Sequence, residues 1–155
     1  MKKESRKARI PRGPIVRTPT VQRQYDLYRR SVKVNDDCVF CNPREMAEPV
    51  QRGEFVVIKN RFQYAVWDGC KVLDHLMVVP KRHVGGLGEL TAQEKTEYVD
   101  LLAEYEARGY SFYSRAVHSA TRSIIHLHTH LIKLDSKSVK GLFYLKKPHV
   151  LLYRK

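Results

Sequence analysis

Three histidines alternate with other residues in one short apolar stretch, and this pattern limits the local fold more than any other feature of the chain. The stretch, residues 123–134, contains His126, His128 and His130. Successive side chains of a β-strand point to opposite faces, so alternate residues share one face. We therefore predict that residues 123–134 form a strand whose three imidazoles line one face, about 6.6–7 Å from one to the next.

A row of imidazoles is suited to chemistry near neutral pH. Imidazole binds metal ions, transfers protons and attacks electrophiles. A single histidine in a sheet is usually a packed or hydrogen-bonded residue, and this structural interpretation stays open for the three in the row. Their strict alternation favours a site that binds a metal or performs catalysis.

Two cysteines at Cys-x-x-Cys spacing indicate a metal site. Cys38 and Cys41 would place two thiolates on one tight turn, which suits zinc. A tetrahedral site needs two further ligands, and His83 with one histidine of the row would complete a Cys2His2 set. The alternatives are a pair of buried thiols or a redox dithiol. Cys70 makes the cysteine count odd, which suits a reducing cytoplasm better than a disulfide framework.

The order of secondary-structure signals predicts an α+β fold with an antiparallel sheet of about five strands. One long helix begins at a capping box, Thr91 with Glu94, and its helical spacing extends to about Tyr113. A short N-terminal helix is expected at about Val21–Arg30. Besides residues 123–134, the expected strands are Glu54–Lys59, Gln63–Trp67, Leu76–Val79, Gly141–Leu145 and His149–Tyr153, of which the last two form a hairpin.

The positive charge is concentrated at the N-terminus. Residues 1–33 hold eleven Lys and Arg against two acidic residues, a charge of +9 (11 minus 2), and the rest holds +4 (18 minus 14). We predict a flexible, basic extension at 1–33 and a single domain at 34–155. Such an arm binds RNA or DNA weakly and in a salt-dependent way. The alternative is a solvated tail that aids solubility.

No membrane segment is expected. No stretch approaches the roughly 18 apolar residues of a membrane span, and no apolar segment of a secretory signal follows the basic start. An Arg-rich, acid-poor start also fits a transit peptide, which is the alternative to the cytoplasmic location that we predict.

Three motifs together resemble the histidine triad (HIT) family of nucleotide hydrolases and transferases. His126-Leu-His-Thr-His-Leu-Ile132 is similar to the family's His-φ-His-φ-His-φ-φ signature, where φ is apolar. Asp74-His-Leu-Met-Val-Val-Pro-Lys-Arg-His83 resembles its Gly-His-x-Leu-Val-Ile-Pro-Lys-x-His segment. Cys38-Val-Phe-Cys41 resembles the Cys-Ile-Phe-Cys of its zinc-bearing branch. The motifs follow the family's order and cover roughly residues 36–135, about two-thirds of the chain.

The resemblance implies a role for each matched residue. His128 corresponds to the nucleophile that attacks the α-phosphorus and forms a nucleotidyl-histidine, which water or another acceptor then releases. His75 and His130 correspond to supporting histidines around the phosphate. The structural zinc of the family would be held here by Cys38, Cys41, His83 and His126.

The loop before the triad departs from the family's pattern. Where the family places an Asn, then glycines and Gly-Gln-Ser, this chain has Arg115, Arg122 and Ser123, of which only the serine matches. We predict that Ser123 and Arg122 bind phosphate, the arginine as a bidentate fork, with a surface arginine as the alternative. Thr129 replaces an apolar residue and Asp74 replaces a glycine.

These departures leave other functions open. The main alternative to an enzyme is a nucleotide- or RNA-binding module without turnover, in which the basic arm supplies affinity. A third is a transferase of the galactose-1-phosphate uridylyltransferase type, although those proteins are longer and read His-Pro-His where this chain reads His126-Leu-His128. The expected partners are a nucleotide and, because the family often forms dimers, a second copy of the chain.

Overall fold

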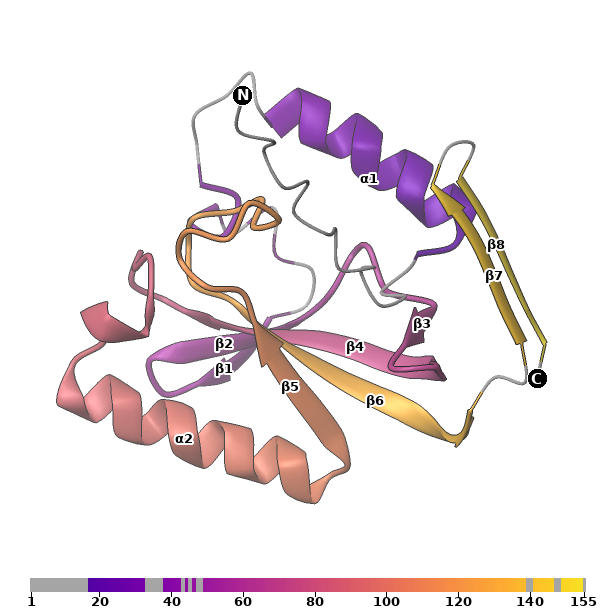
Figure 1. Cartoon of the computed structure of the whole chain (residues 1–155). Coiled ribbons are helices and arrows are strands. Elements are labelled where there is room, and N and C mark those ends of the chain that lie inside the picture. Colours follow the sequence, from indigo (N-terminus) through magenta and orange to yellow (C-terminus); the bar gives the residue numbers. More distant parts are fainter. Residues whose placement is uncertain are drawn as a thin grey trace, which may run out of the picture.

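The computed structural model describes residues 17–32, 38–42, 44, 46, 49–138, 141–146 and 149–154 (Figure 1). Most of the predicted basic arm and the ends of the Cys-x-x-Cys segment therefore lie outside the described residues. The helices are α1 (Pro19–Val32), the short 3-10 helix η2 (Leu87–Glu89) and α2 (Ala92–Ala107). The strands are β1 (Val50–Arg52), β2 (Phe55–Lys59), β3 (Val66–Trp67), β4 (Cys70–Pro80), β5 (Tyr110–Ser114), β6 (Thr129–Ser138), β7 (Gly141–Lys146) and β8 (His149–Arg154).

The strands form one antiparallel sheet and a separate hairpin. The sheet has the order β1-β2-β4-β6-β5, and β3 pairs with β4 beside this path. Strands β7 and β8 pair only with each other among the described strands. The predicted α+β fold, with about five antiparallel strands, one long helix and a short N-terminal helix, is confirmed, and so is the C-terminal hairpin.

The two helices lie on opposite sides of the sheet (Figure 1). Alternation along β2 shows how the sequence produces this: Phe55 and Val57 pack toward α2, whereas Val56 and Ile58 pack toward the other face. The α2 side of the core contains Leu101, Leu102 and Tyr105 of the helix together with Leu127 and Leu131. Burial of these apolar side chains is the main force that holds α2 on the sheet.

The other face of the sheet carries the Cys-x-x-Cys turn and α1. Val39 and Phe40 from the turn and Tyr28 from α1 pack with Met77 and Val79 of β4. The turn is closed by a hydrogen bond from the Cys41 amide to the Cys38 carbonyl, 3.0 Å long. This face therefore receives both the cysteines and the odd-numbered residues of β4, and it is the face that carries the candidate site.

The long helix ends earlier than predicted. The periodicity was expected to continue to about Tyr113, but α2 ends at Ala107 and residues 110–114 form β5. Gly109 adopts a φ of +82°, a left-handed conformation that glycine tolerates and that ends a helix. Tyr110–Ser114 then pair with β6, so tertiary pairing overrides the local helical spacing.

The histidine strand begins later than predicted. Residues 123–128 lie outside a strand, and β6 begins at Thr129. Consequently His130 is on the strand, whereas His126 and His128 are on the loop that enters it. The alternation of faces still holds across this boundary, because Leu127 and Leu131 are buried on the α2 side while the histidines face the other side.

Smaller differences concern strand lengths. The expected strand Leu76–Val79 is the end of the much longer β4, and the expected strand Gln63–Trp67 is reduced to Val66–Trp67. The predicted turn at Asp68-Gly69 is confirmed, since both residues have positive φ (47° and 71°) and Trp67 pairs with Cys70. Among the described residues, no helix is long and apolar enough to cross a membrane.

Candidate active site and metal centre

Four predicted metal ligands converge although they come from three separate segments. One donor atom from each of Cys38, Cys41, His83 and His126 lies within 4.8 Å of the others. The Sγ of Cys41 is 3.2 Å from Nδ1 of His83 and 3.5 Å from Nδ1 of His126, and the Sγ of Cys38 is 3.3 Å from Nδ1 of His126. Two thiols and two imidazoles so close together could hold a metal ion.

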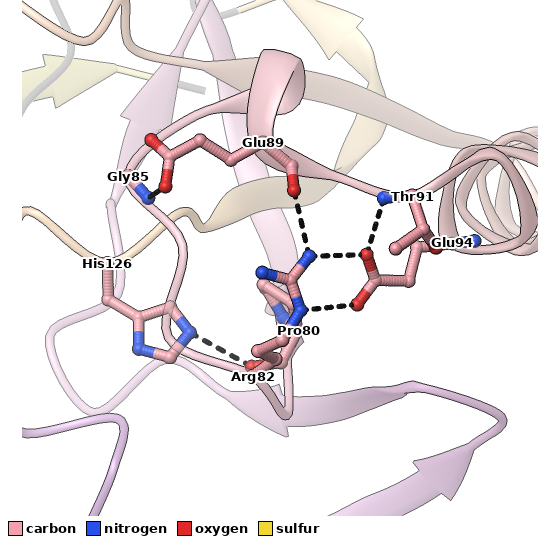
Figure 2. Close-up of polar contacts among 7 residues, drawn as sticks. All are labelled: Pro80, Arg82, Gly85, Glu89, Thr91, Glu94 and His126. Atoms are coloured by element: carbon pink, nitrogen blue, oxygen red, sulfur yellow. Dashed lines mark hydrogen bonds and ion pairs between the residues drawn. The ribbon is translucent and has the colours of Figure 1, made fainter.

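The imidazole of His126 is oriented for metal binding. The side chain is completely buried, and its Nε2 lies 2.9 Å from the carbonyl oxygen of Pro80, so Nε2 carries the proton and donates it there (Figure 2). Nδ1 then has its lone pair directed toward the two thiols. Burial is the main cause that lowers the pKa of His126, which keeps the ring neutral and able to coordinate.

The segment that carries His83 is anchored to the start of α2. Arg82 donates to both carboxylate oxygens of Glu94, at 3.1 and 2.7 Å, and to the carbonyl oxygen of Glu89 at 2.8 Å (Figure 2). Glu94 also closes the capping box with Thr91. The hydrogen bonds from Arg82 are the main cause that lowers the pKa of Glu94 to about 2, so the carboxylate stays charged and holds the segment.

One ring nitrogen of His128 forms a hydrogen bond with the backbone, and the other has a free lone pair. Nδ1 lies 2.8 Å from the carbonyl oxygen of His126, so Nδ1 carries the proton and the lone pair is on Nε2. Burial lowers the pKa of His128, and the ring is neutral at neutral pH. The ring of Phe40 packs against it with a centroid distance of 5.3 Å. A neutral imidazole with an available Nε2 is a competent nucleophile.

His75 and His130 form a buried pair on β4 and β6. The backbone amide of Tyr64 donates to Nδ1 of His75 over 3.2 Å, so the proton of His75 is on Nε2. That nitrogen lies 2.9 Å from Nδ1 of His130 and 3.1 Å from Nδ2 of Asn60; in this tautomer Nδ1 of His130 accepts from His75, and Nε2 of His130 carries a proton. Burial lowers the pKa of His75 to about 3 and that of His130 well below its ordinary value. His130 is thus a neutral donor, and its ring centroid is 5.3 Å from that of His128.

Two residues that depart from the family pattern, Asp74 and Thr129, form side-chain hydrogen bonds. Asp74, in place of a glycine, accepts a hydrogen bond from the hydroxyl of Tyr110 over 2.6 Å and one from the amide of His75 over 2.9 Å. Thr129, in place of an apolar residue, is buried, and its Oγ1 is 2.7 Å from the hydroxyl of Tyr98 on α2. Both changes thus position the strands that carry His75 and His130.

The predicted phosphate-binding residues occupy different environments. Arg122 donates through Nε to the carbonyl oxygen of Ile124 over 3.0 Å and through Nη2 to those of Gly85, over 2.6 Å, and Ile125. Its Nη1 is buried and has no hydrogen-bond partner among the described residues. Ser123 is exposed, and its Oγ accepts a hydrogen bond from the hydroxyl of Tyr25 on α1 over 3.1 Å. Arg122 therefore braces the loop that leads to His126.

Several residues near the histidines were missed by the sequence prediction. The ring of Tyr113 stacks on His130 and contacts Trp67, and Tyr64 packs against both His75 and His130. Arg17, within the extension predicted to be flexible, lies close enough that its charge lowers the pKa of His75 and His130. Isolated aromatic residues and one arginine among many carry no sequence signal for such a position.

Comparisons with known proteins found similar solved structures of low sequence identity. No protein-family model and no curated protein matches the chain. A hypothetical protein from Leishmania major aligns with a TM-score of 0.50 and 21% identity, over 71% of this chain and 82% of its own. A HIT family hydrolase from Clostridium thermocellum (TM-score 0.49, 21% identity, 71% of this chain and 98% of its own) also matches. So does one from Legionella pneumophila Philadelphia 1 (0.46, 16%, 66% and 95%).

Proposed function

We propose that this chain is a HIT-type hydrolase or nucleotidyltransferase that attacks the α-phosphate of a nucleotide through His128. The observation that carries the proposal is the fixed tautomer of a buried, neutral imidazole, whose Nδ1 donates to the His126 carbonyl and whose lone pair is on Nε2. A second neutral imidazole, His130, lies beside it and carries a proton on Nε2. A nucleophile next to a donor is the arrangement that displacement at phosphorus requires.

The reaction divides into two displacements. In the first, the Nε2 lone pair of His128 forms a bond to phosphorus, and the bond from phosphorus to the leaving group breaks with its electron pair on that group. In the second, a water oxygen bonds to phosphorus, the N–P pair returns to Nε2, and the water proton passes to solvent. An acceptor hydroxyl in place of water gives transfer. Splitting the reaction in this way lowers each barrier.

The developing negative charge on the phosphate oxygens needs donors. In this proposal the Nε2–H of His130 is one such donor. His75 donates a hydrogen bond to Nδ1 of His130 and thereby keeps the proton of His130 on Nε2. The buried Nη1 of Arg122 and the hydroxyl of Ser123 are the further phosphate-binding groups. His75 acts only through His130 and is therefore a positioning residue.

We infer that zinc is the metal held by the four converging ligands. Tetrahedral zinc, with Zn–S near 2.3 Å and Zn–N near 2.0–2.1 Å, separates sulfur from nitrogen by about 3.5 Å. The observed separations of 3.2–3.5 Å between Sγ and Nδ1 fit this value. A site with four protein ligands is closed, so zinc would supply rigidity alone: it would tie the Cys-x-x-Cys turn to the loop that leads into His128.

The test is turnover by the His128→Ala variant. Purified protein is incubated with labelled adenosine phosphoramidate, and AMP and a covalent nucleotidyl adduct are measured together. The wild type should form both, and His128→Ala should lose turnover by roughly 10³-fold or more while it keeps its fold and zinc content. His118→Ala, at an exposed histidine, is the matched control and should behave as wild type. Full activity of His128→Ala would rule out the mechanism.

The second candidate is a binding module without turnover. It is favoured by the arginines at positions 115 and 122, where the family places Asn and Gln, because added positive charge strengthens ground-state binding of phosphate. Tight nucleotide binding by a zinc-loaded sample, with no product and no adduct across a panel of phosphoramidates and dinucleoside polyphosphates, would decide for this candidate.

A further inference from the structure

The ring of His130 lies between two tyrosines, each of which has an arginine beside it. Tyr113 stacks on His130 at a centroid distance of 5.8 Å and an interplanar angle of 22°, and Tyr64 packs at 5.8 Å. The guanidinium carbon of Arg115 is 5.2 Å from the Tyr113 centroid, and that of Arg17 is 5.0 Å from the Tyr64 centroid. Two guanidinium groups thus border the same buried histidine.

Segments far apart in the chain bring these arginines together. Arg115 follows directly after β5, where Tyr113 pairs with His130. Arg17 precedes α1, and its Nε donates to the carbonyl oxygen of Phe62 over 3.0 Å, while its guanidinium carbon lies 4.0 Å from the Tyr25 centroid. Each arginine is half-buried and is held by the fold. Their proximity is therefore a product of the tertiary structure.

The charges of Arg17 and Arg115 both act on the buried His130, and the Asp26 carboxylate acts on Arg17 with the opposite sign. Burial is the main cause that lowers the pKa of Arg17, and the positive charge of Arg115 adds to it. Both charges also lower the pKa of His130, and Arg122 with Arg115 acts likewise on His128. Among the described residues, neither Arg115 nor Arg122 forms a salt bridge with a carboxylate. Positive charge gathered beside neutral imidazoles marks a site for an anion.

We propose that Arg17 and Arg115 form a second anion subsite beside His130, which binds phosphate groups of the substrate other than the one that His128 attacks. This inference rests on the proposed function and narrows it to nucleotides that carry an oligophosphate chain. Arginine suits this role because its planar guanidinium binds phosphate oxygens in a bidentate way. The N-terminal segment thereby contributes to substrate selection.

Binding of inorganic tripolyphosphate tests the subsite without any turnover. Calorimetric titrations compare the zinc-loaded wild type with Arg17→Ala, Arg115→Ala and the control Arg23→Ala, which removes one positive charge from the exposed side of α1. Arg17→Ala and Arg115→Ala should each weaken binding by about tenfold or more, the usual effect of losing a hydrogen bond to a charged group. Arg23→Ala should stay within about twofold, because it changes only the net charge.

Equal binding by wild type, Arg17→Ala and Arg115→Ala would overturn the subsite whatever the protein does with nucleotides. Circular dichroism and zinc content establish that each variant is folded. Arg17→Lys, which keeps the charge and loses the fork, gives a second comparison and should bind tripolyphosphate with intermediate affinity. Binding of Arg17→Lys as weak as that of Arg17→Ala would also fit the subsite, whereas wild-type binding by both variants would overturn it.

A kinetic readout separates this inference from the proposed function. The ratio of kcat/KM for diadenosine tetraphosphate to kcat/KM for adenosine phosphoramidate should fall by about tenfold in Arg17→Ala and should not change in Arg23→Ala. An unchanged ratio in Arg17→Ala would contradict the subsite. If the wild type turns over neither compound, the proposed function fails, and the tripolyphosphate titrations still decide whether the subsite exists.

Discussion

The tautomers of the histidines are set by single contacts around each ring. A backbone amide directed at Nδ1 of His75 places its proton on Nε2, and a backbone carbonyl beside Nδ1 of His128 places the proton there. In the proposed mechanism these two contacts give the two imidazoles different roles, His75 as a donor to His130 and His128 as the nucleophile. Burial keeps both rings neutral, because charging a desolvated imidazole is unfavourable.

The neutral state of His75 predicts how stability depends on pH. Its pKa is lowered from 6.5 to about 3 in the folded protein, mainly by burial, so between these values the unfolded chain binds more protons than the folded one. Stability from this group is therefore fully present above pH 6.5 and is lost as pH falls toward 3. The slope is up to about 1.4 kcal/mol per pH unit.

The measurement compares the free energy of unfolding of wild type and His75→Gln between pH 7 and pH 4. Because the variant lacks the imidazole, its stability should decrease less steeply, and the difference between the two curves should shrink as pH falls. Contributions shared by both proteins, including release of a bound metal, cancel in this difference. Parallel curves would show that His75 does not titrate as inferred.

Substitution of one cysteine tests the proposed set of metal ligands. Cys41→Ser removes the thiol that lies within 3.5 Å of both His83 and His126 and should reduce the zinc content of the purified protein from about one ion per chain to well below it. Cys70→Ser, at the third cysteine, which is outside this group, is the control. A full zinc content in Cys41→Ser would contradict the assigned ligand set.

At the scale of elements, α2 covers one face of the sheet and also holds the segment that carries His83. Its first turn supplies Glu94, which caps the helix through Thr91 and holds Arg82, next to His83 (Figure 2). The start of α2 is therefore joined by hydrogen bonds to the segment that carries the candidate metal ligand His83. A substitution that removes the cap should weaken metal binding, because the segment that carries His83 would lose its hydrogen bonds to α2.

We expect Glu94→Ala to lower both the melting temperature and the affinity for zinc. Loss of the cap and of the contact with Arg82 should reduce the melting temperature by roughly 2–6 °C, and competition with a chelator should show weaker zinc binding. Glu106→Ala, at an exposed position in the last turn of α2, is the matched control and should change neither. Reduced stability with unchanged zinc affinity would show that the cap and the metal site are independent.

At the scale of the whole molecule, the basic N-terminus has two parts. Residues 17–32 pack on the domain through Arg17, Tyr25 and Tyr28. Residues 1–16 hold six Lys and Arg against one acidic residue, a charge of +5 (6 minus 1). We propose that the first sixteen residues supply a weak RNA or DNA contact, whereas Arg17 contributes to the anion subsite.

Salt dependence distinguishes this contact from binding at the active site. Removal of residues 2–16 should weaken binding of single-stranded RNA and lower the slope of log affinity against log salt by several units, because each phosphate contact releases a counterion. Tripolyphosphate binding should change far less, since Arg17 and Arg115 remain. An unchanged RNA affinity after this deletion would assign the tail to solubility alone.

Local features of the sequence were sufficient to predict most of the helices and strands. The capping box at Thr91 marked the start of α2, Asp68-Gly69 marked a hairpin turn, and hydrophobic alternation marked the strands, because each of these signals depends on neighbours in the chain. The spacing of the cysteines indicated a metal site that needs two histidines, the resemblance implied His83 and His126, and the structure brings the four residues together. Element ends were less predictable: α2 ends at Ala107, two residues before Gly109, because residues 110–114 pair with β6.

Only the tertiary structure decided which residues from distant segments meet. The pairing of β4 with β6 brings His75 to His130, backbone groups of remote loops select the tautomers, and α1 carries Arg17 to the edge of the histidine pair. No local pattern encodes these contacts, because they depend on strand register and on how helices pack across the sheet. The sequence by itself therefore determined most of the elements and the residue types of the candidate site, and the fold determined the protonation of the histidines, their neighbours and the charge that surrounds them.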